Sequence, residues 1–432
     1  MKNRKALALI AILALVAAAC GGSDGGSDDA VVEVETTEAP ATTEAPTTTA
    51  APAPAGDPLI LASLMPLSGD LASLGPGIAL GAALAVEQIN AAGGINGQPV
   101  QLIEGDSGCD GAVALTSLND VIAQGAQGVM GAACSGTSLA ILDTAIAAEV
   151  VMVSPSNTSP QFTKIDKKGF YARTAPSDLL QGDVLASLLV EDGVQTVSII
   201  SRADSYGRGL AEATAAAFEA AGGTVKTIVY HATDASEFTS EVTAVGKGGA
   251  DAIVGILFPE TGCGVLQPAF EQGLLDTPWY MTDGVKDAGL ASLCGLGTAL
   301  DGFKGTAPGS AAGEAKDAFE AAYAEVSADG SPTFIFAPQA YDAVMLMAIS
   351  AAANGVTGPE IASGLVAASS GGEKCIGVAC IALAADGVDV DYVGASGEIE
   401  LDAVGDPTAA TYDIWTTEGD TNPVLKSVDF GS

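Results

Sequence analysis

The chain has 432 residues, with 53 Asp and Glu, 16 Lys and Arg and one His, which gives a formal net charge of -37. Such a charge excludes a protein that binds the phosphate backbone of nucleic acids or sits on anionic membranes through basic side chains. The composition is also 48% hydrophobic, so the chain can bury a large core and most of it is not disordered.

The first 19 residues have the pattern of an export signal. Three basic residues precede an apolar run over residues 6–19, which is shorter than the roughly 20 residues that a membrane-spanning helix needs. The run ends at Cys20 and resembles the lipobox of bacterial lipoproteins, in which the cysteine is lipidated and the leader is cleaved. We therefore predict a signal peptide over residues 1–19 and a lipid on Cys20. An ordinary cleaved signal that happens to precede a cysteine is the alternative.

Residues 20–56 differ sharply in composition from the remainder of the chain. They are rich in Thr, Pro, Glu and Ala, contain Thr-Glu-Ala-Pro twice and show no apolar periodicity. A segment of this kind cannot supply a core, so it is predicted to be a disordered tether. The globular body is expected to begin at about Asp57.

The cysteines of the body number six, and an even number in an exported domain predicts three disulfides. Fifteen pairings are possible, and the order along the chain makes 109–134, 263–294 and 375–380 the simplest set. A metal site is not expected, because the spacings are not those of zinc ligands and His231 is isolated. The six residues are Cys109, Cys134, Cys263, Cys294, Cys375 and Cys380.

Strands and helices alternate along the predicted body. The near-continuous apolar strands are typical of parallel sheets that helices cover on both faces. Two sheets of about four strands each predict two lobes, with a crossover over residues 171–176. The expected strands span residues 59–65, 99–104, 128–131, 150–153, 196–201, 225–230, 252–257 and 279–281. The helices between them span residues 76–90, 111–123, 139–148, 209–221, 238–247 and 265–272.

The rest of the chain continues with mixed elements. A strand follows Phe303, and helices are expected over residues 314–326 and 338–353. Short alternating strands over residues 398–401 and 411–415 are predicted for the tail.

Polar residues follow the strands of both predicted sheets, and ligands bind at the carboxyl ends of strands in open α/β sheets. The first lobe offers hydroxyls and loop amides there, which suit a carboxylate. The second offers carboxylates and aromatic rings, which suit an ammonium group. A zwitterion held between two lobes fits this division. The alternative is that the hydroxyl residues only cap helices.

Enzyme motifs are not found. The glycines over residues 75–81 do not have the spacing of a dinucleotide-binding loop, and Pro76 interrupts them. The acids Asp386, Asp389 and Asp391 lack the spacing of a calcium-binding EF-hand. We predict a protein that is not an enzyme and that carries no cofactor or metal.

A family resemblance appears in several motifs. Leu-Ser-Gly at residues 67–69 and Ala-Val-Glu-Gln-Ile-Asn-Ala-Ala-Gly-Gly-Ile-Asn-Gly at residues 85–97 resemble the opening of type I periplasmic binding proteins, in the Leu/Ile/Val-binding branch of ABC transporter receptors. Segments at residues 106–110, 133–135, 154–158 and 205–209 come in that family's order. The resemblance implies an α/β fold of two Rossmann-like parallel-sheet lobes joined by a hinge of three crossovers. Lobe I would comprise residues 57–175 and 303–393, and lobe II residues 176–302 and 394–432.

The same resemblance implies a ligand site. Ser135 would hold the ligand carboxylate, Thr158 would contact carboxylate and amine, and the backbone carbonyl of Ser156 would accept from the amine. Asp283 would neutralise the ammonium, although the Leu/Ile/Val-binding protein has Glu there. Three further expected contacts are Tyr206, Leu74 where an aromatic is usual, and Phe258 in place of a tyrosine.

The implied function is that of an extracytoplasmic, lipid-anchored, monomeric substrate-binding protein of an ABC importer. It would capture an amino acid, foremost leucine, isoleucine or valine, and deliver it to the permease and ATPase subunits. The alternatives are the same scaffold binding an amide, urea or another small solute, and a receptor domain that senses its ligand. The body carries 46 acids and 13 bases, so its acidity is expected to belong to a solvated surface adapted to salt or to a docking face for the permease.

Overall fold

The computed structural model describes residues 56–235 and 237–431. The predicted signal peptide, lipidation site and nearly all of the predicted tether lie outside these residues. No helix in the described part of the chain is long and apolar enough to cross a membrane.

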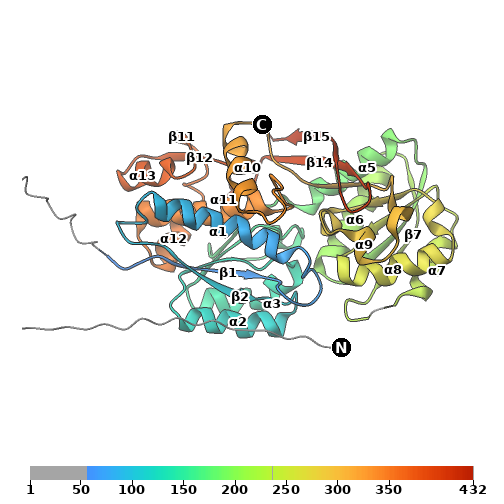
Figure 1. Cartoon of the computed structure of the whole chain (residues 1–432), viewed down its shortest axis with the longest axis horizontal. Helices are drawn as coiled ribbons and strands as arrows, with labels where there is room; N and C mark the ends of the chain where they lie inside the picture. Colours follow the sequence, from blue (N-terminus) through green and yellow to red (C-terminus); the bar gives the residue numbers. More distant parts are fainter. Residues whose placement is uncertain (1–55, 236, 432) are drawn as a thin grey trace, which may run out of the picture. The chain divides into compact units, whose positions relative to one another are not determined.

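Five parallel strands form the first main sheet, in the order β2-β1-β3-β4-β5. Figure 1 shows β1 and β2 of this sheet between α1 and α2. The predicted alternation of strand and helix is confirmed here. The strands are β1 Ile60–Met65, β2 Gln101–Asp106, β3 Gly128–Gly131, β4 Val151–Ser154 and β5 Tyr171–Arg173. The helices of this lobe, lobe I, include α1 Gly75–Ala91, α2 Gly111–Ala123, α3 Ser135–Ala147, α4 Gln161–Lys164, α11 Ala337–Asn354 and α12 Gly358–Gly364.

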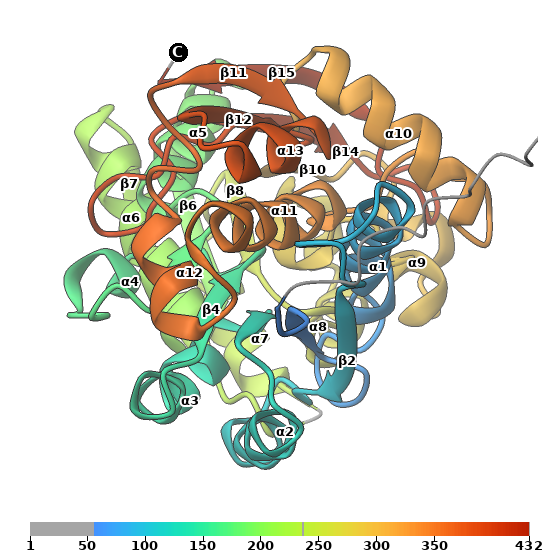
Figure 2. The ribbon, with the colours of Figure 1, turned by 90° about the vertical axis from the view of Figure 1, so that its left-hand side faces the viewer.

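Alternate residues of β1 face two separate helical layers. Leu61 and Met65 belong to the apolar cluster that includes Ile78 of α1 and most of α11. Leu64 belongs instead to the cluster that includes Leu118 of α2. Figure 2, which looks along the molecule from the lobe I end, shows α1 and α11 on one side of β4 and β2 and α2 and α3 on the other. The sheet is therefore covered on both faces, as the apolar strands predict.

The second main sheet belongs to lobe II and has seven strands, in the order β15-β14-β10-β9-β8-β6-β7. The expectation of about four strands is wrong, because β10, β14 and β15 extend the sheet at one edge, where β14 runs antiparallel to both of its neighbours. The strands are β6 Thr196–Arg202, β7 Thr224–His231, β8 Ala252–Ile256, β9 Trp279–Met281, β10 Lys304–Pro308, β14 Ala410–Thr416 and β15 Val424–Phe430. The helical elements are α5 Asp178–Glu191, α6 Ser205–Ala220, α7 Thr239–Gly246, α8 Pro259–Glu271, α9 Leu290–Leu293, η1 Leu274–Asp276, η2 Asp283–Val285 and η3 Gly297–Leu300.

A third, small sheet packs beside α11. It contains β11 Glu373–Ile376, β12 Val390–Gly394 and β13 Gly397–Glu398, accompanied by α10 Glu314–Val326 and α13 Ala379–Ala385. Of the two short strands expected in the tail, the second is β14 and the first is reduced to the two residues of β13.

The predicted lobe boundaries shift once the sheets are known. Residues 171–176 were expected to be crossover, but Tyr171–Arg173 pairs with β4 as the edge strand β5. The chain was predicted to return to lobe I at residue 303. This prediction is wrong, because the next strand, β10, pairs with β9 and β14 of lobe II, and the chain returns only after it. The last crossover, from lobe I to lobe II, ends at β14 rather than at residue 394, because the backbone amide of Ala395 still donates to Asp342 of α11 in lobe I.

A buried ion pair joins two of the crossovers between the lobes. Arg173, at the end of β5, donates from Nε and Nη2 to the two carboxylate oxygens of Asp406, at 3.0 and 2.7 Å. Arg173 is fully buried, and Asp406 lies just before β14 on the last crossover. Bidentate pairs of this kind fix geometry, so the two chain segments keep a constant separation in the hinge.

The three disulfides have the simplest pairing along the chain, Cys109–Cys134, Cys263–Cys294 and Cys375–Cys380. This order was the favoured one of the fifteen, and it is confirmed. The first joins the turn before α2 to the residue that precedes α3, close to the carboxyl ends of the lobe I strands.

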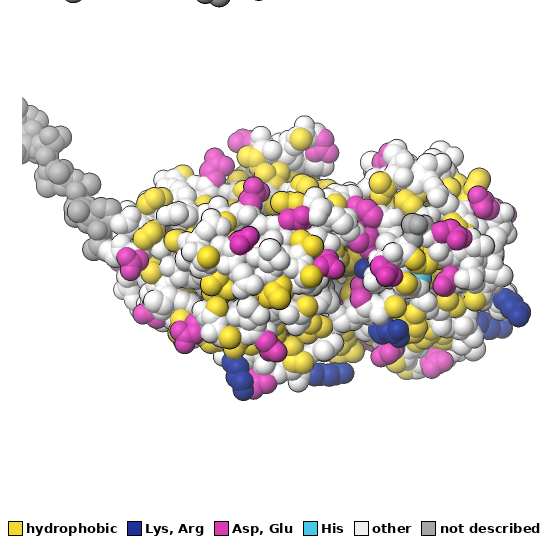
Figure 3. Space-filling model, turned by 90° about the horizontal axis from the view of Figure 1, so that it is seen from below, with side chains coloured by type: hydrophobic (Ala, Val, Ile, Leu, Met, Phe, Trp, Pro, Cys, Tyr) yellow, Lys and Arg dark blue, Asp and Glu magenta, His cyan; other side chains and the backbone are white. Residues whose placement is uncertain are grey.

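Acidic side chains are scattered over both lobes on the face that Figure 3 shows, and basic side chains there are few. The acids do not gather over one element on this face. The surface therefore fits a generally solvated acidic shell better than a single acidic docking patch on this side.

We expect the double substitution Cys109→Ser with Cys134→Ser to destabilise the protein more than Cys375→Ser with Cys380→Ser. The cysteines are 25 residues apart in the first pair and 5 in the second. Loop-closure entropy therefore gives about 3.5 kcal/mol for the first and about 2 kcal/mol for the second. Urea unfolding of both variants measures the difference, and equal losses would contradict the entropic explanation.

Candidate functional site

A pocket lies between the two lobes, where loops leave the carboxyl ends of both main sheets. The space between its lining atoms, including the part open to solvent, is about 310 Å³. Six of the seven predicted ligand-contacting residues line it: Leu74, Ser135, Ser156, Tyr206, Phe258 and Asp283. Five lining residues were not predicted: Leu71, Ile78, Ala133, Gly284 and Phe336.

The lobe I side of this pocket presents hydroxyls and backbone amides. Ser135 is the first residue of α3, so the unpaired amides of that helix start lie at the pocket. Its Oγ accepts from the backbone amide of Ser159 at 3.4 Å. Ser156 donates from Oγ to the carbonyl of Ala133 at 3.1 Å. Because this side carries a helix N-terminus and no acid, it is suited to an anionic group such as a carboxylate.

Thr158, the seventh predicted residue, is fully buried but does not line the pocket. Its hydroxyl has no hydrogen-bond partner among the described residues. Its carbonyl accepts from the amide of Asp178, the first residue of α5, at 2.8 Å. Its contact with a ligand stays a prediction.

The lobe II side presents a buried carboxyl group. Asp283 follows β9 at the start of η2 and is 2% exposed. Its Oδ1 accepts from the hydroxyl of Tyr206 at 2.9 Å and from Nε2 of Gln181 at 2.8 Å. Burial raises the pKa of Asp283 to about 6, although these two hydrogen bonds lower it.

A second buried carboxyl group, that of Asp178, was missed by the sequence reasoning. It is fully buried, and neither of its oxygens accepts a hydrogen bond from the part of the chain described. Burial and then the charge of Asp283 raise the pKa of Asp178 well above its usual value. Two adjacent acids of this kind favour a cation beside them, because a positive charge would stabilise both ionised forms.

Gln181 was also missed. Neither residue was predicted, because no helix was expected between residues 176 and 196. It lies one turn after Asp178 on α5 and donates to Asp283 and to the carbonyl of Thr306 of β10, at 3.1 Å. The apolar run over residues 179–190 is the signal that would have predicted this helix.

The remaining wall of the pocket is apolar and aromatic. The rings of Phe258 and Tyr206 stack with centroids 5.3 Å apart. Leu71 and Phe336 both have positive φ, 81° and 61°, which is costly for residues with side chains. Backbone strain at two lining residues is typical of a functional site, because the surrounding structure must hold them in place.

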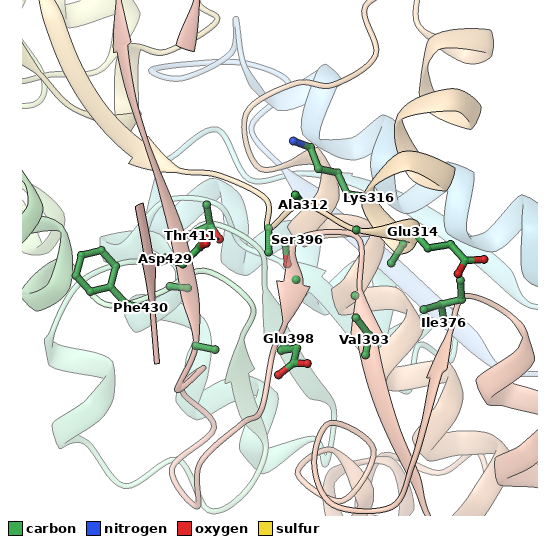
Figure 4. A pocket seen from close by; sticks show the side chains of 17 residues that line it. Ala312, Glu314, Lys316, Ile376, Val393, Ser396, Glu398, Thr411, Asp429 and Phe430 are labelled. Atoms are coloured by element: carbon green, nitrogen blue, oxygen red, sulfur yellow. Dashed lines mark hydrogen bonds between the residues drawn. The ribbon is translucent and has the colours of Figure 1, made fainter. Parts of the chain in front are cut away.

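A larger open hollow, about 900 Å³, lies over the crossover segments (Figure 4). Thr411 and Asp429 of lobe II face it, and so do Ser396 and Glu398 of the small sheet. Ser396 and Thr411 donate to carboxylates of the protein, and no buried polar atom that lacks a partner among the described residues lines this hollow. The pocket between the lobes is the better candidate site, because the buried acid Asp283 and the start of α3 face it from different lobes.

Comparison with known proteins identifies the family. A family model described as periplasmic binding protein matches residues 58–374. The chain belongs to the periplasmic binding protein family. Members of this family are extracytoplasmic solute-binding proteins rather than enzymes.

Curated relatives match over part of their length. An amino acid binding protein of Pseudomonas aeruginosa is 34% identical over 238 residues, which is 53% of this chain and 62% of the relative. A leucine-, isoleucine-, valine-, threonine- and alanine-binding protein of the same organism is 29% identical over 304 residues, 68% of this chain and 78% of the relative.

Solved structures share the fold at lower identity. A branched-chain amino acid transporter substrate binding protein from Streptococcus pneumoniae, in complex with isoleucine, has a TM-score of 0.72 at 22% identity, and 87% of this chain and 100% of that chain align. A solute binding protein from Rhodopseudomonas palustris, in complex with p-hydroxybenzoic acid, has a TM-score of 0.72 at 19% identity, with 87% and 98% aligned. The predicted two-lobe α/β fold is thus confirmed.

We expect Tyr206→Phe to raise the pKa of Asp283 above its wild-type value of about 6, because one hydrogen bond to the carboxylate is lost. Carbon-13 NMR titration of the Asp side chains would measure it. The matched control is Tyr392→Phe, since Tyr392 donates to Asp342 at 2.7 Å in lobe I. That variant should alter the titration of Asp342 and leave Asp283 unchanged, and the reverse result would contradict the assignment.

Proposed function

We propose that this protein is the substrate-binding component of an ABC importer and captures an amino acid with an aliphatic side chain, foremost leucine, isoleucine or valine. The observation that carries the proposal is the buried acid Asp283 opposite the N-terminus of α3 across one pocket, with the buried carboxyl group of Asp178 behind the lining. Opposite charges at the two sides of a closed pocket match a zwitterion.

The carboxylate of the ligand would lie against lobe I. The hydroxyl of Ser135 and the first amides of α3 would donate to it. Charge-assisted hydrogen bonds to a helix N-terminus need no basic side chain, and the lining of this pocket contains none.

The ammonium group of the ligand would lie against lobe II. It would donate to Asp283 and supply the positive charge that Asp283 and Asp178 lack among the lining residues. Because Tyr206 and Gln181 already hold one oxygen of Asp283, the carboxylate is oriented before the ligand arrives, which lowers the entropy cost of binding.

The side chain of the ligand would lie against Leu71, Leu74, Ile78 and Phe336. Each methylene that these residues bury contributes about 0.8 kcal/mol. Leu74 in a position where an aromatic residue is usual leaves more room at this wall, which fits a branched aliphatic side chain.

The relatives support the amino-acid class, because the two Pseudomonas proteins are named for binding amino acids. In the importer the closed, loaded form would dock on a permease with its ATPase subunits. The predicted signal peptide and the lipid on Cys20 would place the protein outside the cytoplasm and tie it to the membrane.

An aromatic carboxylic acid is the second candidate ligand. The Rhodopseudomonas structure holds p-hydroxybenzoic acid on the same fold, and the stacked rings of Tyr206 and Phe258 offer this chain an aromatic wall. Such a ligand has no ammonium, so Asp283 would have to stay protonated when it binds.

We expect Asp283→Asn to weaken the binding of isoleucine at least a hundredfold, because the ammonium loses its charged partner while the side-chain shape is kept. Calorimetric titration of the full chain with amino acids, amides, urea and 4-hydroxybenzoate would measure it, with Glu191→Gln on the surface of α5 as control. If 4-hydroxybenzoate binds the wild type and the amino acids do not, the amino-acid assignment is wrong.

The affinity for isoleucine is expected to fall as the pH is lowered through about 6, by up to tenfold per pH unit below that value. The pKa of Asp283 is about 6 in the empty pocket, and an ammonium beside it favours the ionised form, so binding below pH 6 must release a proton. Calorimetry in buffers of different ionisation enthalpy measures the proton release directly.

The stability of the ligand-free protein should depend on Asp283 in the opposite direction, so that this group lowers the free energy of unfolding as the pH rises. Since burial raises the pKa of Asp283 above its usual value, its contribution to stability is fully present at low pH and is lost as the pH rises through about 6. Asp283→Asn should remove both trends, and persistence of either in that variant would assign it to another group.

A further inference from the structure

The loop before α1 in lobe I meets the start of α8 in lobe II beside the ligand pocket. Glu260 of α8 accepts from the backbone amides of Leu71 and Ser73, at 2.7 and 2.8 Å. In the opposite direction, Asp70 of the loop accepts from the backbone amide of Thr261, at 3.1 Å. Each lobe thus supplies a carboxylate that caps backbone amides of the other lobe.

Arg202 lies at the centre of this contact. It is the last residue of β6 and is 2% exposed. Its Nη1 donates to Asp70 across the lobe boundary and to Thr261 Oγ1 at 3.0 Å. Its Nε donates to Asp204 of its own lobe at 2.9 Å. With Asp204 and Thr261 holding the guanidinium, the bond to Asp70 adds no new ordering cost within lobe II.

Side-chain packing connects this contact to the ligand pocket. The guanidinium carbon of Arg202 lies 3.9 Å from the centroid of the Phe258 ring. Phe258 in turn stacks on Tyr206, which donates to Asp283. Neither Asp70 nor Arg202 lines the pocket, so both act on a ligand only through the residues that do.

We propose that Asp70 and Arg202 form an interlobe clasp and are positioning residues that set the rate of ligand release. The proposal rests on the proposed function for the identity of the ligand, but the clasp itself is a contact between the lobes. Release requires the lobes to separate, and separation breaks the Asp70–Arg202 ion pair together with the three amide caps. Ligand entry happens while the clasp is open, so removing the clasp changes the association rate far less than the release rate.

The test compares Asp70→Ala with the wild type, as full chains. L-Isoleucine is the probe for stopped-flow measurement of association and release. Hydrogen exchange of the ligand-free protein, read on peptides that cover residues 258–266 of lobe II, reports the contact without any ligand. The matched control is Glu191→Gln, because Glu191 pairs with Lys426 inside lobe II.

The expected result is release of isoleucine faster by about tenfold to a hundredfold in Asp70→Ala, with association within about twofold of the wild type. The substitution in lobe I should also speed amide exchange at the start of α8 in lobe II. The control should change neither quantity. If Asp70 had only a structural role in lobe I, Asp70→Ala would lower the unfolding temperature but would not speed amide exchange at the start of α8.

Two results separate the clasp from the proposed function. If the wild type binds no isoleucine but α8 still exchanges faster in Asp70→Ala, the clasp stands and the ligand assignment falls. If release and α8 exchange are both unchanged, the clasp is refuted. Asp70→Asn keeps an acceptor for the Thr261 amide and removes only the charge, so it should give an intermediate release rate if Asp70→Ala fails to fold.

Discussion

A carboxylate enclosed by protein at Asp283 constrains the arrangement of lobe II. Enclosing an ionised carboxylate costs several kcal/mol unless hydrogen bonds compensate for the lost water. Tyr206 from α6 and Gln181 from α5 provide those bonds, and Gln181 also binds the carbonyl of Thr306 in β10. Asp283 and Gln181 therefore connect α5, α6 and the inner strand β10. Burial still raises the pKa of Asp283 to about 6, and a bound cation would lower that pKa by favouring the ionised form.

The lobe I side of the pocket is positioned equally firmly, but without ionisable side chains. Ser135 and the first amides of α3 are placed by β3, whose carboxyl end leads into that helix. Because parallel strands bring all their carboxyl ends to one edge, the polar residues of each lobe gather there without any other requirement. Where two such edges face one another, helix starts favour an anion on both sides, and the carboxyl group of Asp283 makes the lobe II side electronegative. The charge separation therefore depends on that side chain as well as on the fold.

Much of this arrangement could be predicted from local patterns. Apolar strands with helices between them indicated both sheets, whereas the ligand residues were predicted from the family resemblance. Six of those seven residues line the pocket, and each of the six follows a strand or starts a helix. Phe336 was missed because it enters the pocket through tertiary packing that no local period records, whereas Asp178 was missed because the helix that begins with it was not predicted. β10 was assigned to the wrong lobe for a related reason: its sequence indicates a strand but not the sheet that accepts it.

The acids and the clasp act on closure in opposite directions. Closing an empty cleft places Asp178 and Asp283 in one dry site, and the amide of Asp178 binds the lobe I carbonyl of Thr158, so lobe I completes this burial. The cost of burying these two carboxyl groups would therefore oppose closure, whereas the Asp70–Arg202 pair would favour it. A ligand shifts such an equilibrium only by its difference in affinity for the two states. An ammonium group would supply that difference by pairing with the buried acids, after which the proposed clasp would hold the lobes together. An uncharged solute of the same size would meet the clasp but leave the cost of burying the acids in place.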